Sequence, residues 1–182
     1  MSLATIDITT QLVERCRRND SAAQFELYSR YNKAMYNISL RMLGDADDAQ
    51  DVLQEAFVAA FQNLQQFTGK ATFGAWLKRI VINKCLDHLK KRRLPIVQME
   101  NVDYKLTEEP TNLKDDFSLY GIEPARVHRE IKSLPKGCRV IFNLYLLEGY
   151  DHKEIAGILE ISESTSKSQY ARAKKLLREK LT

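Results

Sequence analysis

The chain has 182 residues, 44% of them hydrophobic, and this length allows one or two domains. Its 28 Lys and Arg residues and 24 Asp and Glu residues leave a formal charge of +4, too small a surplus to indicate nucleic-acid binding by itself. The three cysteines are far apart, odd in number and not in a C-x-x-C pairing, so neither a disulfide framework nor a zinc knuckle is indicated. No export signal or membrane-spanning run is found, so we expect a cytoplasmic protein with no direct membrane insertion.

Helical spacing dominates the first ninety residues. A short helix is predicted around Thr10–Arg18, and a second is predicted to start at Asp20 or Ser21 and to end at Gly44. A third helix is marked by apolar residues three and four apart, and the pattern resumes in a fourth helix from Phe73 to Leu89. The apolar positions of the second and third helices are Phe25, Tyr28, Tyr31, Met35, Ile38 and Met42, and then Ala49, Val52, Leu53, Ala56, Phe57, Ala60, Phe61 and Leu64. Four such helices are enough to close one core.

Periodicity disappears in the next thirty residues, where the charge becomes negative and three prolines occur. Seven acids face two lysines there, which indicates a solvated linker. Helical spacing then returns and continues to the C-terminus. Because no strand alternation is found, we expect an all-α fold of two small helical domains, residues 1–94 and 125–182, joined by an irregular acidic linker at residues 95–124.

The C-terminal segment has the pattern of a helix-turn-helix. Asp151 can cap a short helix that ends at Leu159, and after a turn at Glu160 the run Ser162–Thr165 can cap a second helix toward Leu181. From Ser166 to the end there are six cations and one acid. Short polar residues at a helix start, followed by cations, are what a DNA recognition helix needs. The alternative is an ordinary solvated helix face.

A second basic segment closes the N-terminal domain. Residues 78–93 hold seven cations and one acid. They follow the aromatic, glycine-containing segment Phe67–Trp76, and this combination suits single-stranded DNA, whose unstacked bases bind aromatic surfaces. Aromatic residues at helical spacing more often belong to a core, and we expect this of Trp76. The loop before it remains a candidate base pocket.

The third predicted helix carries acids in its first turns. Asp45, Asp47, Asp48, Asp51 and Glu55 exceed what the helix dipole requires, although the dipole accounts for some of them. An acidic face is repelled by DNA and attracted by a basic protein surface. We therefore expect this helix to face a protein partner.

Together these segments resemble the extracytoplasmic-function (ECF) sigma factors of bacterial RNA polymerase, in the sigma-seventy family. The resemblance covers nearly the whole chain. It is carried by residues 47–57 (DDAQDVLQEAF), 73–77 (FGAWL) with Arg79, Ile80 and Asn83, Leu134–Pro135, 154–156 (EIA), 161–162 (IS) and 164–168 (STSKS).

The resemblance implies a sigma-two domain that binds core RNA polymerase and helps to melt promoter DNA. Its implied polymerase contacts are Asp48, Asp51, Gln54 and Glu55. The implied contacts of the melted minus-ten strand are Thr68, Gly69, Lys70, Arg79, Asn83 and Lys84.

The resemblance also implies a sigma-four domain that binds the duplex minus-thirty-five element, and an anti-sigma factor as a further partner. The implied duplex contacts are Lys153, Thr165, Lys167, Ser168, Gln169, Arg172 and Lys175. Three positions depart from the family pattern. Glu160 replaces a common glycine and requires strain or another backbone conformation. Ser166 replaces an apolar residue, so its hydroxyl must be hydrogen-bonded or partly exposed. Ala171 is smaller than the contact residues possible there.

Two other functions compete with this one. A stand-alone helix-turn-helix transcription regulator requires a receiver or ligand domain upstream, and residues 1–93 lack the alternating strand and helix pattern of a receiver. A helical adaptor that binds only protein leaves both basic helices without a role. The three histidines are isolated, and no phosphate loop, metal-ligand spacing or nucleophile elbow is found. We therefore expect neither enzymatic activity nor a cofactor.

Overall fold

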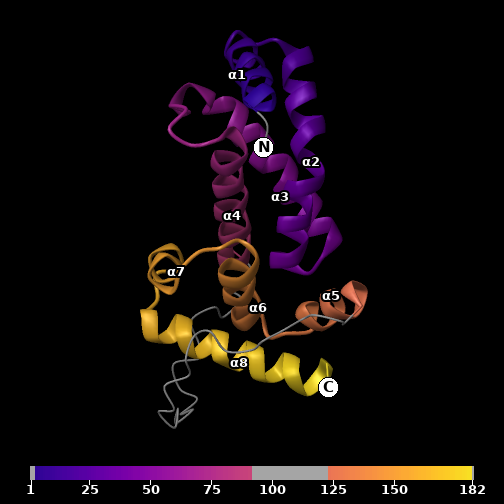
Figure 1. Cartoon of the computed structure of the whole chain (residues 1–182), viewed down its shortest axis with the longest axis vertical. Helices are drawn as coiled ribbons and strands as arrows, with labels where there is room; N and C mark the ends of the chain where they lie inside the picture. Colours follow the sequence, from indigo (N-terminus) through magenta and orange to yellow (C-terminus); the bar gives the residue numbers. More distant parts are fainter. Residues whose placement is uncertain (1–2, 92–122, 182) are drawn as a thin grey trace. The chain divides into compact units, whose positions relative to one another are not determined.

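The computed structural model describes residues 3–91 and 123–181, with side chains from residue 8 onward. These two ranges contain helices and no strand, which agrees with the predicted all-α class (Figure 1). Contacts divide the chain into two compact units, Met1–Leu89 and Lys90–Thr182. Of the expected linker, all but Glu123 and Pro124 lies outside the described residues. None of the described helices is both long enough and apolar enough to cross a membrane.

The first unit consists of four α-helices and a short 3-10 turn. They are α1 (Leu3–Arg17), α2 (Ser21–Leu43), α3 (Ala46–Gln62), η1 (Leu64–Gln66) and α4 (Phe73–Lys91). The helix α1 begins at Leu3, earlier than the predicted start near Thr10. The boundaries of α2 are those predicted: the Asp20 carboxylate accepts hydrogen bonds from the amides of Ala22 and Ala23, and Gly44 ends the helix with a φ of 76°.

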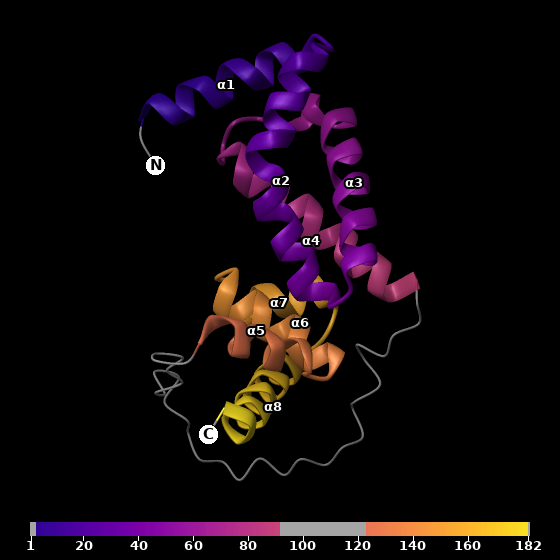
Figure 2. The same cartoon turned by 90° about the vertical axis from the view of Figure 1, so that its right-hand side faces the viewer.

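The helices α2 and α3 run side by side (Figure 2). Leu27, Met42 and Val52 are among the fully buried side chains, and Leu77 and Leu89 of α4 are buried in the same unit.

Phe25 is not part of this core, contrary to the predicted apolar stripe. It is 72% exposed. Ala23 and Leu27 are both buried, and successive residues of an α-helix are turned by roughly 100°, so a residue two positions from each points to the opposite side. The three-and-four spacing with Tyr28 concealed this difference.

The second unit contains α5 (Pro124–Lys132), α6 (Lys136–Phe142), the π-helical continuation η2 (Asn143–Leu147), α7 (His152–Leu159) and α8 (Glu163–Leu181). Figure 1 shows α8 lying along α5, α6 and α7, and each of these three helices contacts it. The core between them includes Phe142, Leu144, Ile155 and Leu177, all fully buried. The boundaries of α7 and α8 match the predicted helix-turn-helix.

Candidate nucleic-acid and protein interfaces

The acidic face of α3 is formed by residues spaced three and four apart. Its exposed members are Asp47, Asp51, Gln54, Glu55 and Val58. The opposite side of the helix is buried in the core, so the acids are held on a fixed, outward surface. Asp47 also serves the helix itself, because it lies in the first turn, where negative charge is favourable, as does the neighbouring Asp48.

Asp48 differs from the other predicted polymerase contacts because it is buried. Its side chain is 13% exposed, and its Oδ1 lies 3.4 Å from Nε2 of His88 on α4. The residue therefore ties the start of α3 to α4 and leaves little of its carboxylate exposed for a partner. We leave it out of the docking set.

Val58 was not predicted as part of any interface. It is 55% exposed and lies on the acidic face, one turn beyond Gln54. An apolar residue inside a polar rim is a common arrangement at protein contacts. Its position outside the apolar stripe of the sequence was the available signal.

Aromatic residues enclose the loop before α4. The ring of Phe67 lies 5.8 Å from that of Phe73 and 5.3 Å from that of Trp76, and Phe73 also meets Tyr31 of α2 at 5.3 Å. Trp76 is half-buried in this cluster, not fully in the core. Between the two phenylalanines the tip of the loop is exposed, and Gly69 takes the left-handed backbone conformation at φ 74°.

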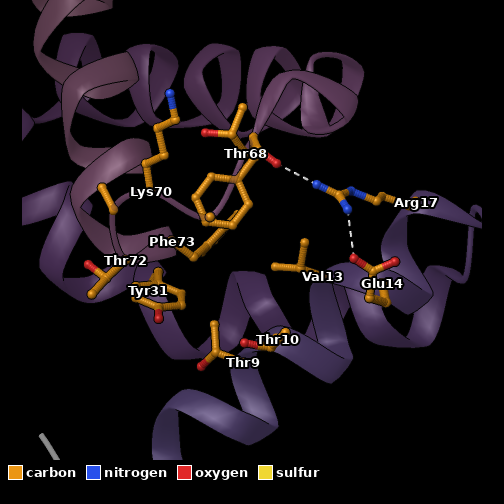
Figure 3. A pocket seen from close by; sticks show the side chains of 13 residues that line it. Thr9, Thr10, Val13, Glu14, Arg17, Tyr31, Thr68, Lys70, Thr72 and Phe73 are labelled. Atoms are coloured by element: carbon orange, nitrogen blue, oxygen red, sulfur yellow. Dashed lines mark hydrogen bonds and ion pairs between the residues drawn. The ribbon is translucent and has the colours of Figure 1, made fainter.

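A pocket of about 580 Å³ opens between this loop, α1 and α2 (Figure 3). Pockets that hold small organic groups have volumes of roughly 300 to 1,000 Å³. The wall includes all three predicted loop residues. It is lined by Thr9, Thr10, Val13, Glu14, Arg17, Tyr31 and the loop residues from Phe67 to Phe73.

The exposed face of α4 begins beside this loop. Ala75, Arg79, Asn83 and Asp87 are four residues apart and all exposed, so two of the predicted strand contacts share one face. Lys84 is half-buried at the side of the helix, and its Nζ lies 3.6 Å from the Glu55 carboxylate of α3. The loop, the pocket and this face together form a continuous set of candidate contacts within the first unit.

In the second unit, a tight turn positions the start of α8. The Asp151 side chain accepts from the Glu154 amide and the Glu154 side chain accepts from the Asp151 amide, a complete capping box on α7. Glu160 then adopts the left-handed conformation with φ 57° and ψ 42°. Of the two possibilities left open by its side chain, strain is the one observed. Ser162 begins α8 by accepting a hydrogen bond from the Thr165 amide at 3.0 Å.

A buried polar pair joins the two helices of the motif. Ser166 is fully buried, and its hydroxyl is hydrogen-bonded at 2.9 Å to Nδ1 of His152, which is also buried. This hydroxyl was expected to be hydrogen-bonded or partly exposed, and the hydrogen bond is what the structure shows. His152 stacks on Tyr145, with ring centroids 4.3 Å apart. Burial lowers the pKa of the His152 imidazole, and the nearby positive charge of Lys167 lowers this pKa further.

Gln169 does not point outward with the other predicted duplex contacts. It is 8% exposed and lies on the buried stripe of α8, one turn after Ser166. Its Oε1 accepts a hydrogen bond from the Cys138 thiol at 2.9 Å. Burial raises the pKa of that thiol, so it keeps the proton that it donates. We therefore leave Gln169 out of the base-contacting set.

The remaining predicted duplex contacts are exposed or partly exposed. Lys153 of α7 is exposed, and so are Lys167 and Lys175 of α8, while Thr165, Ser168 and Arg172 are partly exposed. Lys167 pairs with Glu163 at 2.7 Å, four residues earlier. A polar start and a basic continuation therefore share one helix, as a DNA-binding helix requires.

Fold and surface charge thus define a two-unit helical protein with one acidic face and two basic helices. Comparisons with known proteins agree with this description. The family model of Sigma-70 region 2 matches residues 27–94, and that of Sigma-70, region 4 matches residues 125–177.

Two curated relatives extend along almost the whole chain. The RNA polymerase sigma-H factor of Pseudomonas aeruginosa is 34% identical, over 92% of this chain and 90% of that protein. The ECF RNA polymerase sigma-E factor of Escherichia coli K12 is 32% identical, over 93% of this chain and 92% of that protein.

Two solved structures share the fold. One is CnrH in complex with the cytosolic domain of CnrY, with a TM-score of 0.52, 24% identity and coverage of 92% of this chain and 93% of that chain. The other is the sigma factor RpoE in complex with the anti-sigma factor NepR from Bartonella quintana, with a TM-score of 0.55, 20% identity and coverage of 86% of this chain and 94% of that chain.

The chain belongs to the sigma-70 family, as an RNA polymerase sigma factor of the ECF type. Sigma factors are transcription initiation factors and not enzymes, which agrees with the function predicted from the sequence. The match to region 2 upstream of the helix-turn-helix disfavours the stand-alone regulator.

Proposed function

We propose that the two units divide the work of promoter recognition. Residues 1–94 dock on core RNA polymerase and hold the melted minus-ten strand, residues 95–124 link the domains, and residues 125–182 bind the minus-thirty-five element as duplex. The observation that carries this division is the separation of charge within the first unit. The helix α3 has an acidic face, and α4 carries cations beside a pocket lined by aromatic residues. One surface attracts a basic protein and the other a nucleic acid.

The surface that docks on polymerase is formed by Asp51, Gln54 and Glu55, with Val58 as an apolar contact one turn beyond Gln54. All four are exposed on one face of α3. The acids favour a basic partner and repel DNA, while burial of Val58 adds affinity that salt does not screen. Asp51→Ala should therefore weaken polymerase binding without unfolding the domain.

The melted strand binds along the loop and the exposed face of α4. Lys70, Arg79 and Lys84 supply positive charge for the phosphates, Asn83 can hydrogen-bond a base, and Thr68 and Gly69 lie at the mouth of the pocket. An unstacked base fits a pocket of this volume, whose wall includes the rings of Tyr31, Phe67 and Phe73. Closed duplex cannot enter such a pocket, so binding there favours DNA opening.

The duplex element is bound by the start of α8. Thr165 and Ser168 lie in its first turns, where short side chains approach base edges, and Arg172 follows one turn later. Lys153, Lys167 and Lys175 are placed for phosphates on either side. The buried pair of His152 and Ser166 holds α7 against α8 and so fixes the angle at which this start is presented.

An anti-sigma factor is a further partner in this proposal. The two solved structures of the same fold are complexes, one with the cytosolic domain of CnrY and the other with the anti-sigma factor NepR. A partner of that kind needs surfaces that are free before polymerase binds. The acidic face of α3 and the exposed Phe25 of α2 offer such surfaces in the first unit.

The test is reconstitution with core RNA polymerase from a bacterium. The purified chain should co-elute with the core on size exclusion, and transcripts from a randomised promoter library should share two upstream elements. Asp51→Ala should reduce co-elution, and Glu179→Ala, which removes one exposed acid from α8, should not. Equal binding by the Asp51→Ala protein would remove the docking assignment, and transcripts without a shared element would remove promoter recognition.

A further inference from the structure

The helix α1 meets the melted-strand loop through one side chain. The guanidinium of Arg17 donates through Nη2 to the carbonyl oxygen of Phe67, fifty residues further along the chain, where the loop begins (Figure 3). A second hydrogen bond runs in the opposite direction, because Nε2 of Gln65 donates to the carbonyl oxygen of Arg17 at 3.4 Å. The C-terminal end of α1 and the start of the loop are therefore joined in both directions.

The Arg17 side chain is itself held in place. Its Nη1 donates to the Glu14 carboxylate at 2.6 Å, one turn earlier on α1, and the side chain is 26% exposed. An arginine fixed at one nitrogen retains little rotamer freedom, so its second hydrogen bond costs less entropy. A hydrogen bond from a charged donor is also stronger than one from a neutral donor.

Phe67 is the point at which this contact acts on the loop. Its carbonyl is held by Arg17, and its ring is held by Phe73 and Trp76 on the other side. The exposed tip, Thr68 to Lys70, follows directly. Arg17 and Glu14 also line the pocket, so the residues that fix the loop form the wall facing it.

We infer that Arg17 is a positioning residue for melted-strand recognition: it sets the place of the loop and thereby the shape of the base pocket. The inference rests on the proposed function of the loop. It assigns a role to α1, which precedes the segment matched by the region 2 model at residue 27. Loss of this contact removes the support of the loop without removing any loop residue.

The test uses holoenzyme reconstituted from core polymerase and the full chain. The probe is a fluorescent single-stranded oligonucleotide carrying the non-template minus-ten sequence of a promoter selected from the random library. Three variants are compared: Arg17→Ala, Arg17→Lys, and Arg18→Ala. The last removes the same charge from the next, exposed residue of the chain and serves as the matched control.

Arg17→Ala is expected to weaken oligonucleotide binding by about 10-fold, the lower end of the effect of one charge-assisted hydrogen bond. Arg17→Lys should recover part of the loss, because lysine retains a charged donor, and Arg18→Ala should bind as the unaltered chain does. Arg17→Ala should also reduce the discrimination between the selected minus-ten sequence and one with single substitutions.

Salt dependence separates positioning from direct phosphate contact. Loss of a phosphate contact lowers the slope of log affinity against log salt by about one, whereas loss of a positioning contact leaves this slope unchanged. A lowered slope, or equal losses in Arg17→Ala and Arg18→Ala, would overturn the inference. If circular dichroism shows that Arg17→Ala does not fold, the oligonucleotide affinities of Arg17→Lys and Arg18→Ala are compared instead. Equal affinities of these two variants then overturn the inference.

Arg79→Ala distinguishes this inference from the proposed function. If unaltered holoenzyme does not prefer the selected oligonucleotide over a scrambled one, the function of the loop is wrong. If it does, and Arg79→Ala weakens binding while Arg17→Ala does not, only the role of Arg17 is wrong.

Discussion

The two basic helices, α4 and α8, both have 19 residues but differ in what precedes them. The start of α8 is fixed by a serine cap, a left-handed turn residue and a buried histidine–serine pair. The start of α4 follows an exposed loop whose tip lines a pocket. A helix with a rigid start suits a duplex of constant shape, whereas a loop beside a pocket suits a base that has left its stack. Surroundings, more than charge, distinguish the two helices.

The largest effect should come from removing one arginine from each basic helix. Arg172→Ala is expected to weaken binding of the upstream duplex by about 1 to 3 kcal/mol and to change the preferred bases, because an arginine that contacts a base contributes to specificity. Arg79→Ala should leave duplex binding unchanged and weaken binding of the melted strand. Selection from a promoter library by each variant holoenzyme measures both effects.

Arg129→Ala on α5 is the control for these two substitutions, since Arg129 has a 71% exposed side chain and lies outside the helix-turn-helix. An unchanged upstream preference in Arg172→Ala would show that Arg172 does not contact a base. If Arg172→Ala and Arg79→Ala weakened duplex binding equally, the contrast between α4 and α8 would itself be wrong.

The next effect concerns the rigid start of α8. Ser166→Ala removes the partner of a buried His152 nitrogen, and an unpaired buried polar atom costs about 1 to 2 kcal/mol. Native-state hydrogen exchange should show that loss in the amides of α7 and α8, with α2 and α3 unchanged. Ser164→Ala, an exposed position on the same turn, is the control. Equal protection in both variants would mean that the pair does not hold the motif together.

The parts of the structure that sequence predicted are those governed by local chemistry. Asp20, Asp151 and Ser162 cap their helices as expected, because a cap depends on a side chain and amides two or three residues away. The hydroxyl of Ser166 was expected to be hydrogen-bonded or partly exposed, and the structure shows the first of these. His152 could not be predicted as its partner, since it lies on another helix.

Three features could not be predicted because they depend on packing between distant segments. Polar residues beside an apolar stripe can face either way, and Asp48 and Gln169 proved to face inward, toward His88 and Cys138. Helical period alone does not separate these orientations. The pocket wall from α1 is likewise a contact across fifty residues, for which the spacing near Arg17 contains no signal.

A smaller effect is expected from pH in the second unit, where His152 is buried. Burial lowers the pKa of His152 below the 6.5 of a free imidazole, so the unfolded chain binds a proton more readily than the folded one. The stability of the unit should therefore be complete above pH 6.5 and fall as the pH drops below it. Nearby Lys167 adds to the shift, while Glu163 and Asp151 oppose it.

Hydrogen exchange of α7 amides at several pH values, corrected for intrinsic rates, measures this loss. The double variant His152→Phe/Ser166→Ala removes the titrating group together with its partner, and its stability should not show the same fall. If the fall persists in the double variant, another group is responsible, and His152 does not set the pH response of the motif.

The smallest effect sharpens the comparison at a single backbone position. Glu160 and Asn19 are both left-handed, with φ values of 57° and 61°, and each precedes a helix of its own unit. Glycine relieves the steric cost at Glu160 but makes the unfolded chain more flexible, so Glu160→Gly should stabilise the second unit by about 0.5 kcal/mol. Asparagine already tolerates this conformation, and Asn19→Gly should therefore give no gain in the first unit. Amide exchange measures both changes.

A gain at Asn19 equal to that at Glu160 would show that side-chain strain is not what distinguishes the two turns. A gain at Glu160 with unchanged duplex affinity would show that the strain at this turn does not set the angle of α8.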